Sequence, residues 1–208
     1  MKKIILLVIL SCILSSCNAV RDAVENVVTG DYVMGIVSGN SWSSEWLGLR
    51  FTAPSNFVMA TQEELVEISQ IGMEMSNLDA ATINWAEVAV AFEMMAMTGD
   101  AMTSVSVLTE RVLLRNLTIE QYLDASIQGF VEATGWQLDF NDDLGTMDFI
   151  GMEWHTATAT VSIPGTGLEW TYRYIVRRFD NRMAFIQIYS LVGEENQIDL
   201  LINSFRAY

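Results

Sequence analysis

Residues 168–190 read LEWTYRYIVRRFDNRMAFIQIYS, and this stretch decides the fold. Two runs rich in β-branched and aromatic residues, Leu168–Phe179 and Met183–Ser190, flank the polar tripeptide Asp180-Asn181-Arg182. Such residues favour strands, and a short Asp/Asn turn between two strand patterns is typical of a β-hairpin. The stretch therefore predicts two long antiparallel strands near the end of the chain.

Three further strand patterns lie just before this hairpin. The segments Trp136–Phe140 and Met147–Ile150 flank a polar Asn-Asp-Asp-Leu-Gly stretch, which predicts a hairpin turn between them. Trp154–Ile163 is rich in Thr and Val and ends at Pro164, which cannot donate to a sheet. The second half of the chain thus predicts a mainly antiparallel sheet.

Helical patterns interrupt the strands. Thr118 followed by Gln121 forms a capping box, an apolar stripe follows at helical spacing, and Gly135 stands where a helix would end. Thr61 with Glu64 predicts a second helix over 61–77. Residues 194–205, with acidic residues in the first turn and an apolar stripe ending at Phe205, predict a third.

The first half predicts two hairpins. Residues 32–37 and 46–51 have strand patterns around a Ser-Gly-Asn-Ser turn. Residues 84–98 contain helix-favouring Ala, Glu and Met, yet apolar residues alternate there, and a Thr-Gly-Asp turn leads into the alternating run 105–109. We therefore expect a hairpin in this region. The whole pattern predicts an α+β domain over 31–208, in which helices pack on the faces of an antiparallel sheet.

Several of these segments resemble the PsbP/Mog1/DcrB-like family. The resemblance implies an α/β/α sandwich and no shared catalytic residues, because members of that family are mostly accessory or binding proteins. The segments that carry it are Gly48–Pro54, the helix Thr118–Thr134, the strands Tyr172–Arg178 and Phe185–Ile188, and the "Ile-x-x-x-Ile-x-Ser-Phe" ending Ile198–Phe205.

The N-terminus has the pattern of a lipoprotein export signal. Lys2 and Lys3 precede an apolar run that is too short to span a bilayer, and Leu14-Ser15-Ser16-Cys17 resembles a lipobox. Residues 1–16 are therefore predicted to be removed, Cys17 to carry diacylglycerol and fatty acyl (palmitate) chains, and residues 17–30 to form a tether. The alternative is an ordinary secretory signal beside an unrelated Cys. Asn18 after the Cys favours onward transport where the host has an outer membrane.

Charge and cysteine content exclude several functions. The full chain has a formal charge of −15, and removal of Lys2 and Lys3, its only lysines, leaves 9 Arg against 26 acidic residues, or −17. Such a charge argues against nucleic-acid binding and against docking on anionic lipid. Cys12 leaves with the signal and Cys17 is acylated, so no thiol remains for a disulfide, a nucleophile or a cysteine metal site. No cofactor is expected.

Few residues suggest catalysis or metal binding. His155 is the only histidine, and no Gly-x-Ser-x-Gly motif accompanies it, so we interpret it as a half-buried strand residue. Asp139, Asn141 and Asp143 have the spacing that begins a calcium loop, but Leu144 and Ile150 occupy the Gly and Glu positions. They form a weak calcium candidate, and a polar turn is the favoured interpretation.

Two groups of side chains are candidates for recognition. Arg173 and Arg177, part of a basic cluster with Arg178 and Arg182, share one strand face and form a candidate anion site, with pairing to acidic neighbours as the favoured alternative. Aromatic and Thr side chains in two strands form a candidate ligand or partner surface, or else core beneath the helices. These are Trp154, Thr156, Thr158, Trp170, Tyr172 and Tyr174.

The sequence thus favours a membrane-anchored, extracytoplasmic lipoprotein without enzymatic activity. Its domain is expected to recognise a protein partner or a small ligand, with the lipid on Cys17 as its contact with the membrane. A solute- or cation-binding lipoprotein is the alternative, and an envelope hydrolase is disfavoured by the single histidine.

Overall fold

The computed structural model describes residues 32–71, 90–112 and 116–208. The predicted signal peptide, Cys17 and the tether lie outside the described residues, as do 72–77 of the predicted helix 61–77 and 84–89 of the predicted strand 84–98. Within the described ranges, no helix is long and apolar enough to cross a bilayer.

An eight-stranded antiparallel sheet is the centre of the domain. Its strands follow the order β4-β5-β6-β11-β10-β9-β7, and β8 pairs with β9 beside β7. The hairpin predicted from residues 168–190 is confirmed, because β10 and β11 pair along their whole length around Asp180-Asn181. The strands are β4 (Phe57–Met59), β5 (Val90–Thr98), β6 (Ser104–Arg111), β7 (Gln137–Phe140), β8 (Gly145–Phe149), β9 (Met152–Ser162), β10 (Glu169–Phe179) and β11 (Arg182–Leu191).

A second sheet of four short strands has the order β1-β2-β3-β12. The predicted strand 32–37 is wrong in its bounds, because only residues from Ile36 onward pair with β2. The predicted strand 46–51 is likewise displaced: a turn occupies 45–48, and strands lie on either side of it. The strands are β1 (Ile36–Ser38), β2 (Ser41–Ser44), β3 (Leu49–Thr52) and β12 (Phe205–Ala207).

Within residues 32–71, 90–112 and 116–208, three helices pack against the sheets. The capping box of α3 (Ile119–Thr134) is present, since the backbone N–H of Gln121 donates to Thr118 Oγ1, and Gly135 ends the helix in the left-handed conformation. α2 spans Gln62–Ile71, within the predicted helix. α4 (Asn196–Ile202) is shorter than the predicted helix 194–205, because Phe205 lies in β12, where its ring contacts Phe51 across the pair with β3.

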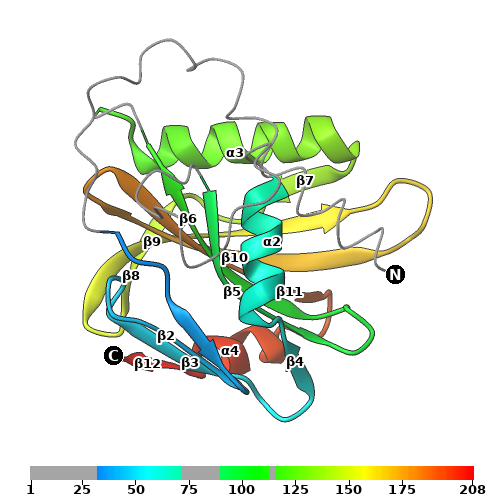
Figure 1. Cartoon of the computed structure of the whole chain (residues 1–208). Helices are drawn as coiled ribbons and strands as arrows, with labels where there is room; N and C mark the ends of the chain where they lie inside the picture. The colour runs from blue at the N-terminus through cyan, green and yellow to red at the C-terminus, as the bar shows by residue number, and fades with distance from the viewer. Residues whose placement is uncertain (1–31, 72–89, 113–115) are drawn as a thin grey trace.

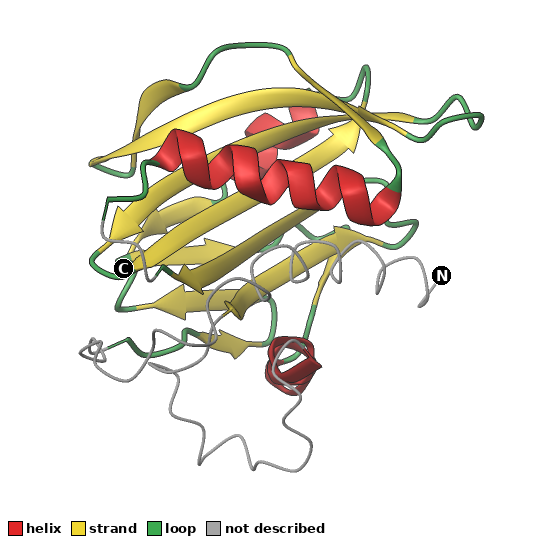
Figure 2. Ribbon diagram, turned by 90° about the horizontal axis from the view of Figure 1, so that it is seen from above, coloured by secondary structure: helices red, strands yellow, loops and turns green. Residues whose placement is uncertain are grey.

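The large sheet is covered on both faces (Figure 1). We call the side beneath α2 and α3 the α3 face, and Figure 2 shows α3 lying over the strands. We call the side covered by the small sheet and α4 the small-sheet face. Each face has its own core: Tyr172, Tyr174 and Phe185 belong to the first, and Trp154, Ile186 and Phe205 to the second. The predicted α+β sandwich is confirmed.

The predicted hairpin between Trp136–Phe140 and Met147–Ile150 is wrong. β7 and β8 do not pair with each other, because both pair with β9: Phe140 lies opposite Ala159 and Gly145 opposite Thr156. They are two parts of one interrupted strand. Residues 141–144 therefore face only residues 157–158, and the extra residues bulge out of the sheet edge.

Candidate functional site

A groove lies between α3 and the break that separates β7 from β8. The break is fixed by Asn141, whose backbone N–H donates to the Thr158 carbonyl (2.8 Å) and whose Oδ1 accepts from Thr160 Oγ1 (3.1 Å). The next two residues, Asp142 and Asp143, are exposed. Because residues 141–144 bulge from the sheet edge on the α3 side, these two carboxylates line the groove opposite the helix.

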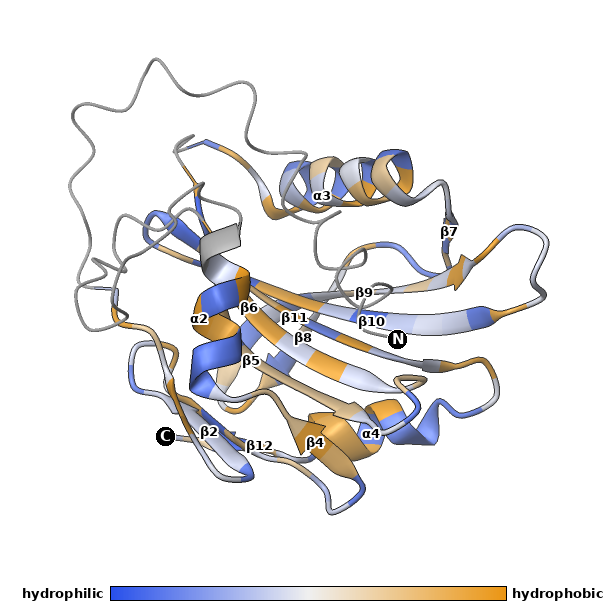
Figure 3. Ribbon diagram, turned by 45° about the vertical axis from the view of Figure 1, so that its right-hand side comes forward, coloured by the Kyte–Doolittle hydropathy of each residue, from blue (hydrophilic) through white to orange (hydrophobic). Residues whose placement is uncertain are grey.

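The other wall of the groove is the first half of α3. Glu120 and Asp124, four residues apart, lie on one side of the helix, and Leu123 lies between them. Glu120, in the first turn of the helix, is favoured by the helix dipole. Figure 3 shows that α3 carries both hydrophilic and hydrophobic residues, as expected for a helix lying on a sheet.

The floor of the groove is apolar. Phe140 is 43% exposed, and Leu144 and Ala157 lie beside it. The volume of the groove is about 200 Å³. An apolar floor between two pairs of carboxylates suits the side chain of Lys or Arg, whose methylene stem packs on apolar surface while its charged end reaches acidic groups.

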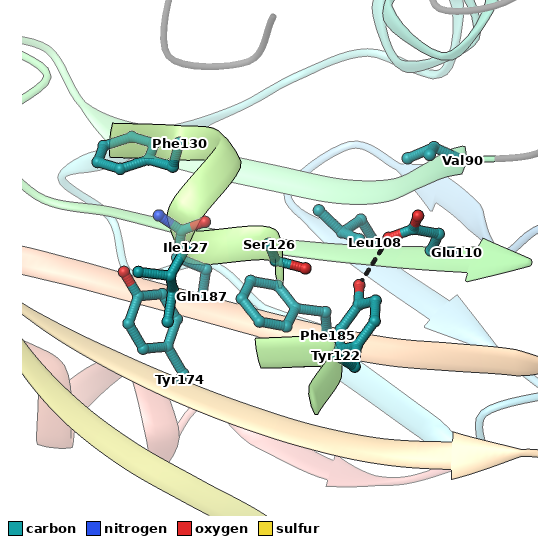
Figure 4. Close-up of a pocket in the computed structure, with 10 residues that line it drawn as sticks. All are labelled: Val90, Leu108, Glu110, Tyr122, Ser126, Ile127, Phe130, Tyr174, Phe185 and Gln187. Atoms are coloured by element: carbon teal, nitrogen blue, oxygen red, sulfur yellow. Dashed lines mark hydrogen bonds between the residues drawn. The ribbon is translucent and has the colours of Figure 1, made fainter. Parts of the chain in front are cut away.

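A second cavity lies between α3 and the middle strands of the large sheet (Figure 4). Tyr122 of α3 donates a hydrogen bond of 2.8 Å to Glu110 Oε2 of β6 at its wall. Its volume is about 30 Å³, enough for a water molecule but about tenfold below that of small-ligand pockets. Its lining residues are Val90, Leu108, Glu110, Tyr122, Ser126, Ile127, Phe130, Tyr174, Phe185 and Gln187.

The predicted aromatic surface is divided between the two faces of the sheet. Trp170, Tyr172 and Tyr174 are buried in the core of the α3 face, whereas Trp154 is buried in the core of the small-sheet face. The reason is the register: Tyr172 lies opposite Ala159, and Thr158 lies opposite Arg173 on the other face. Thr156 and Thr158 therefore share a face with Trp154 and not with the other three aromatic residues. The six side chains do not form one surface.

The predicted anion-site arginines do share a face. Arg177 Nη1 donates to the Glu153 carbonyl (3.3 Å), and its guanidinium lies 5.2 Å from the centre of the Phe179 ring. Arg173 Nε is buried without a hydrogen-bond partner in the structure, like the hydroxyls of Thr156 and Thr158. Arg173 Nε and these two hydroxyls are closed off from solvent. The role of Arg173 and Arg177 in anion binding stays a prediction.

In the described part of the chain, the other predicted residues, His155 and the calcium candidate, lie apart from one another. His155 is half-buried in β9, between Thr146 of β8 and Val176 of β10. Asn141 of the calcium candidate is used to hold the break in the sheet, and it separates Asp139, within β7, from Asp143, in the bulge. Among the described residues, no three His, Cys, Asp or Glu side chains are placed to hold a metal ion.

Sequence reasoning found one side of the groove and missed the other. The sequence predicts the polar stretch 141–143 as a turn, but its position beside α3 depends on both β7 and β8 pairing with β9. Glu120 is an ordinary first-turn residue of the predicted helix, and Asp124 lies one turn further along it. The available signal was their spacing around Leu123 on a helix that the sequence does predict.

Comparison with known proteins gives matches of fold alone. No protein-family model matches the chain, and no curated protein matches it. Among solved structures, it is similar to cyanobacterial PsbP (CyanoP) from Synechocystis sp. PCC 6803, with 10% identity over 88% of this chain and 99% of that one and a TM-score of 0.46. The Ran-binding protein Mog1p of Saccharomyces cerevisiae has 10% identity over 82% of this chain and 95% of that one, with a TM-score of 0.38.

A third similar structure is that of a protein from Bacteroides thetaiotaomicron VPI-5482, with 10% identity and a TM-score of 0.42. The match covers 83% of this chain and 49% of the Bacteroides protein, so this chain spans about half of it. The matches to PsbP and Mog1p agree with the fold that the sequence resemblance implies.

Proposed function

We propose that this protein is a lipid-anchored, extracytoplasmic binding domain without enzymatic activity, and that it recognises a protein partner through the groove beside α3. The lipobox-like Leu14-Ser15-Ser16-Cys17 supports the anchor. The domain is held at the outer side of the cytoplasmic membrane, or at an outer membrane where the host has one. Lipid holds it there, because a chain of formal charge −17 is repelled by anionic headgroups.

The groove beside α3 is the observation that supports recognition of a protein partner. Its half-exposed Phe140 lies between Glu120 and Asp124 on one side and Asp142 and Asp143 on the other. A basic residue on the surface of a protein partner matches this combination, since four carboxylates provide the charge and the phenyl ring provides apolar contact. A small organic ligand is less well supported, because the cavity under α3 has room only for water.

The anchor is tested by the tryptic N-terminal peptide of the membrane-bound protein. Trypsin cuts after Arg21, the first basic residue of the mature chain, so the expected peptide is Cys17–Arg21 with acyl chains and a diacylglyceryl thioether on Cys17. Cys12→Ser is the matched control and leaves this peptide unchanged, whereas Cys17→Ser leaves an uncleaved precursor. Recovery of an unmodified peptide Ile4–Arg21 from the wild type would refute the anchor.

The groove is tested by carbodiimide crosslinking in intact cells, which joins a carboxylate to a nearby amine. The mature chain has no lysine, so a side-chain amide formed on it links it to another molecule. We expect the links to a partner's lysines to map to Glu120, Asp124, Asp142 or Asp143. Links spread evenly onto exposed carboxylates outside the groove, such as Glu153 and Glu169, would argue against it.

A further inference from the structure

A fully buried carboxylate lies in β5, the second strand from one edge of the large sheet, where nothing in the groove uses it. Glu93 is 0% exposed and stands at a β-bulge in β5: Phe92 pairs with Leu108 and Met94 with Val107, while Glu93 has no partner in β6. The bulge turns this side chain out of the regular alternation of the strand. The N–H of Phe92 is satisfied instead by Ser69 Oγ of α2 (2.9 Å), so the bulge is held from both sides.

The Glu93 carboxylate binds the segment that leads into the domain. Oε1 accepts a hydrogen bond from the Tyr32 hydroxyl and Oε2 accepts one from the backbone N–H of Gly35, both at 2.6 Å. Gly35 approaches so closely that a Cβ there would lie 2.7 Å from Glu93 Oε2. These contacts place the segment Tyr32–Ser38, which we call the entry segment, directly on the buried carboxylate.

At its beginning the entry segment is held by side chains and not by strand pairing, because Tyr32 and Met34 are buried in the core of the α3 face. Residues 32–35 form no strand, and Val33 is 66% exposed. Gln62 of α2 contributes three hydrogen bonds: it accepts from the Val37 N–H and donates to the Gly35 carbonyl and to the Met34 sulfur. The Tyr32 ring lies against Trp46 and under the Arg182 guanidinium, 4.0 Å from the ring centre.

We propose that Glu93 is a clasp whose charge sets how firmly the entry segment is held, so that the segment opens more readily when the carboxylate is ionised. In the closed state the charge is shut away from water, and two accepted hydrogen bonds offset only part of that cost. Opening lets water reach the carboxylate. The neutral acid gains little from this and stays closed, so the device would respond to the acidity outside the membrane.

The titratable and charged groups around Glu93 support easier opening of the entry segment when this carboxylate is ionised. Burial raises the pKa of Glu93 to about 7, although its hydrogen bonds and the Arg182 charge oppose the rise. Burial also raises the pKa of Tyr32, which stays neutral, and lowers that of Arg182, which stays charged. Arg111 and Glu110 of β6 act on Arg182 with opposite signs. Glu93 is thus the group of this cluster that changes charge near neutral pH.

Hydrogen exchange of the full chain at pH 5.5 and pH 8 tests the clasp, with rates corrected for the intrinsic pH dependence of amide exchange. A carboxyl with a pKa of about 7 when closed and about 4.5 when open makes the opening equilibrium of residues 33–38 about 27-fold larger at pH 8 than at pH 5.5. Peptides from β10 and β11 report opening of the whole domain, and they should stay far more protected than residues 33–38 at both pH values.

Two isosteric substitutions complete the test. Glu93→Gln keeps an acceptor for Tyr32 or Gly35 but cannot ionise, so its opening should be equal at the two pH values after correction. Glu63→Gln changes an exposed residue of α2 and should keep the wild-type response. Opening in the wild type that does not change with pH overturns the proposal whether or not Glu93→Gln folds, and so does a pH response that survives in Glu93→Gln.

Discussion

The two faces of the large sheet are covered in different ways. On the small-sheet face, Phe205 contacts Phe51 at 4.8 Å and Phe149 at 5.4 Å between ring centres, and Trp154 is completely buried beside them. On the α3 face, one long helix leaves a small cavity beneath it and an acidic groove at its side. Close packing on one side makes a scaffold, and incomplete coverage on the other leaves carboxylates and a phenyl ring open to a partner.

The largest expected effect comes from removing a ring on the closely packed face. Phe205→Ala should lower the free energy of unfolding by about 3–5 kcal/mol, because it leaves a cavity among aromatic rings. Phe140→Ala, the same change in the groove, should cost about 1 kcal/mol or less because that ring is already half in water. Urea unfolding followed by Trp fluorescence measures both. Equal losses would mean that the two faces are packed alike.

The next effect concerns the pH dependence of the whole fold. The pKa of Glu93 is raised from 4.5 to about 7 by burial, so the folded state binds a proton more tightly than the unfolded chain. Its contribution to stability is therefore full below pH 4.5 and lost as the pH rises through 7, by up to about 3 kcal/mol. Urea unfolding from pH 5 to pH 8 should show a decline that Glu93→Gln flattens. An identical decline in that variant would show that other groups cause it.

A smaller effect tests how α3 is fixed over its face. Thr118→Ala removes the side chain that accepts from the Gln121 N–H, and should cost about 1 kcal/mol. Thr118→Ser keeps the acceptor and should cost less. Because α3 forms one wall of the groove, the loss should increase hydrogen exchange in the first turn of α3 and leave β12 unchanged. An equal increase in hydrogen exchange in the first turn of α3 and in β12 would show that α3 is part of the closely packed scaffold.

The smallest effect on stability should come from charge reversal in the groove. Asp124→Arg with Asp143→Arg changes two exposed residues, so the free energy of unfolding should change by no more than about 0.5 kcal/mol per residue. Crosslinking to the partner should nevertheless be lost. Glu153→Arg with Glu169→Arg makes the same change in net charge outside the groove and should keep the crosslink. Loss in both variants would mean that total charge, and not the groove, attracts the partner.

The sequence predicts those parts of the fold that depend on neighbouring residues. The β10–β11 hairpin follows from its turn, and α3 follows from Thr118, Gln121 and Gly135. Prediction from the sequence fails where pairing with a strand that is distant in the sequence decides the local structure. The turn at 141–145 joins no hairpin, because β9 is long enough to pair with both β7 and β8, and Phe205 leaves its helix because β3 offers a free edge.

The candidate site shows the same limit. The six residues of the predicted aromatic and Thr surface were grouped by alternation within each strand, but the register between β9 and β10 puts Trp154 and Tyr172 on opposite faces. Glu93 is not among the residues that the sequence analysis singles out, although it is a single carboxylate within the apolar run 88–97. Its importance depends on the bulge and on Tyr32 and Gly35, which are about 60 residues away in sequence and adjacent to it in the fold.

The most direct test of recognition by the α3 face compares two equally exposed positions on opposite sides of the molecule. Phe140 in the groove is 43% exposed and Leu200 on α4 is 44% exposed. A photo-crosslinking amino acid is placed at each position in turn, in cells that make the protein, and the joined proteins are identified by mass spectrometry. We predict one specific partner from position 140 that is absent from position 200. The same products from both positions, or a specific partner from position 200 alone, would contradict recognition by the groove.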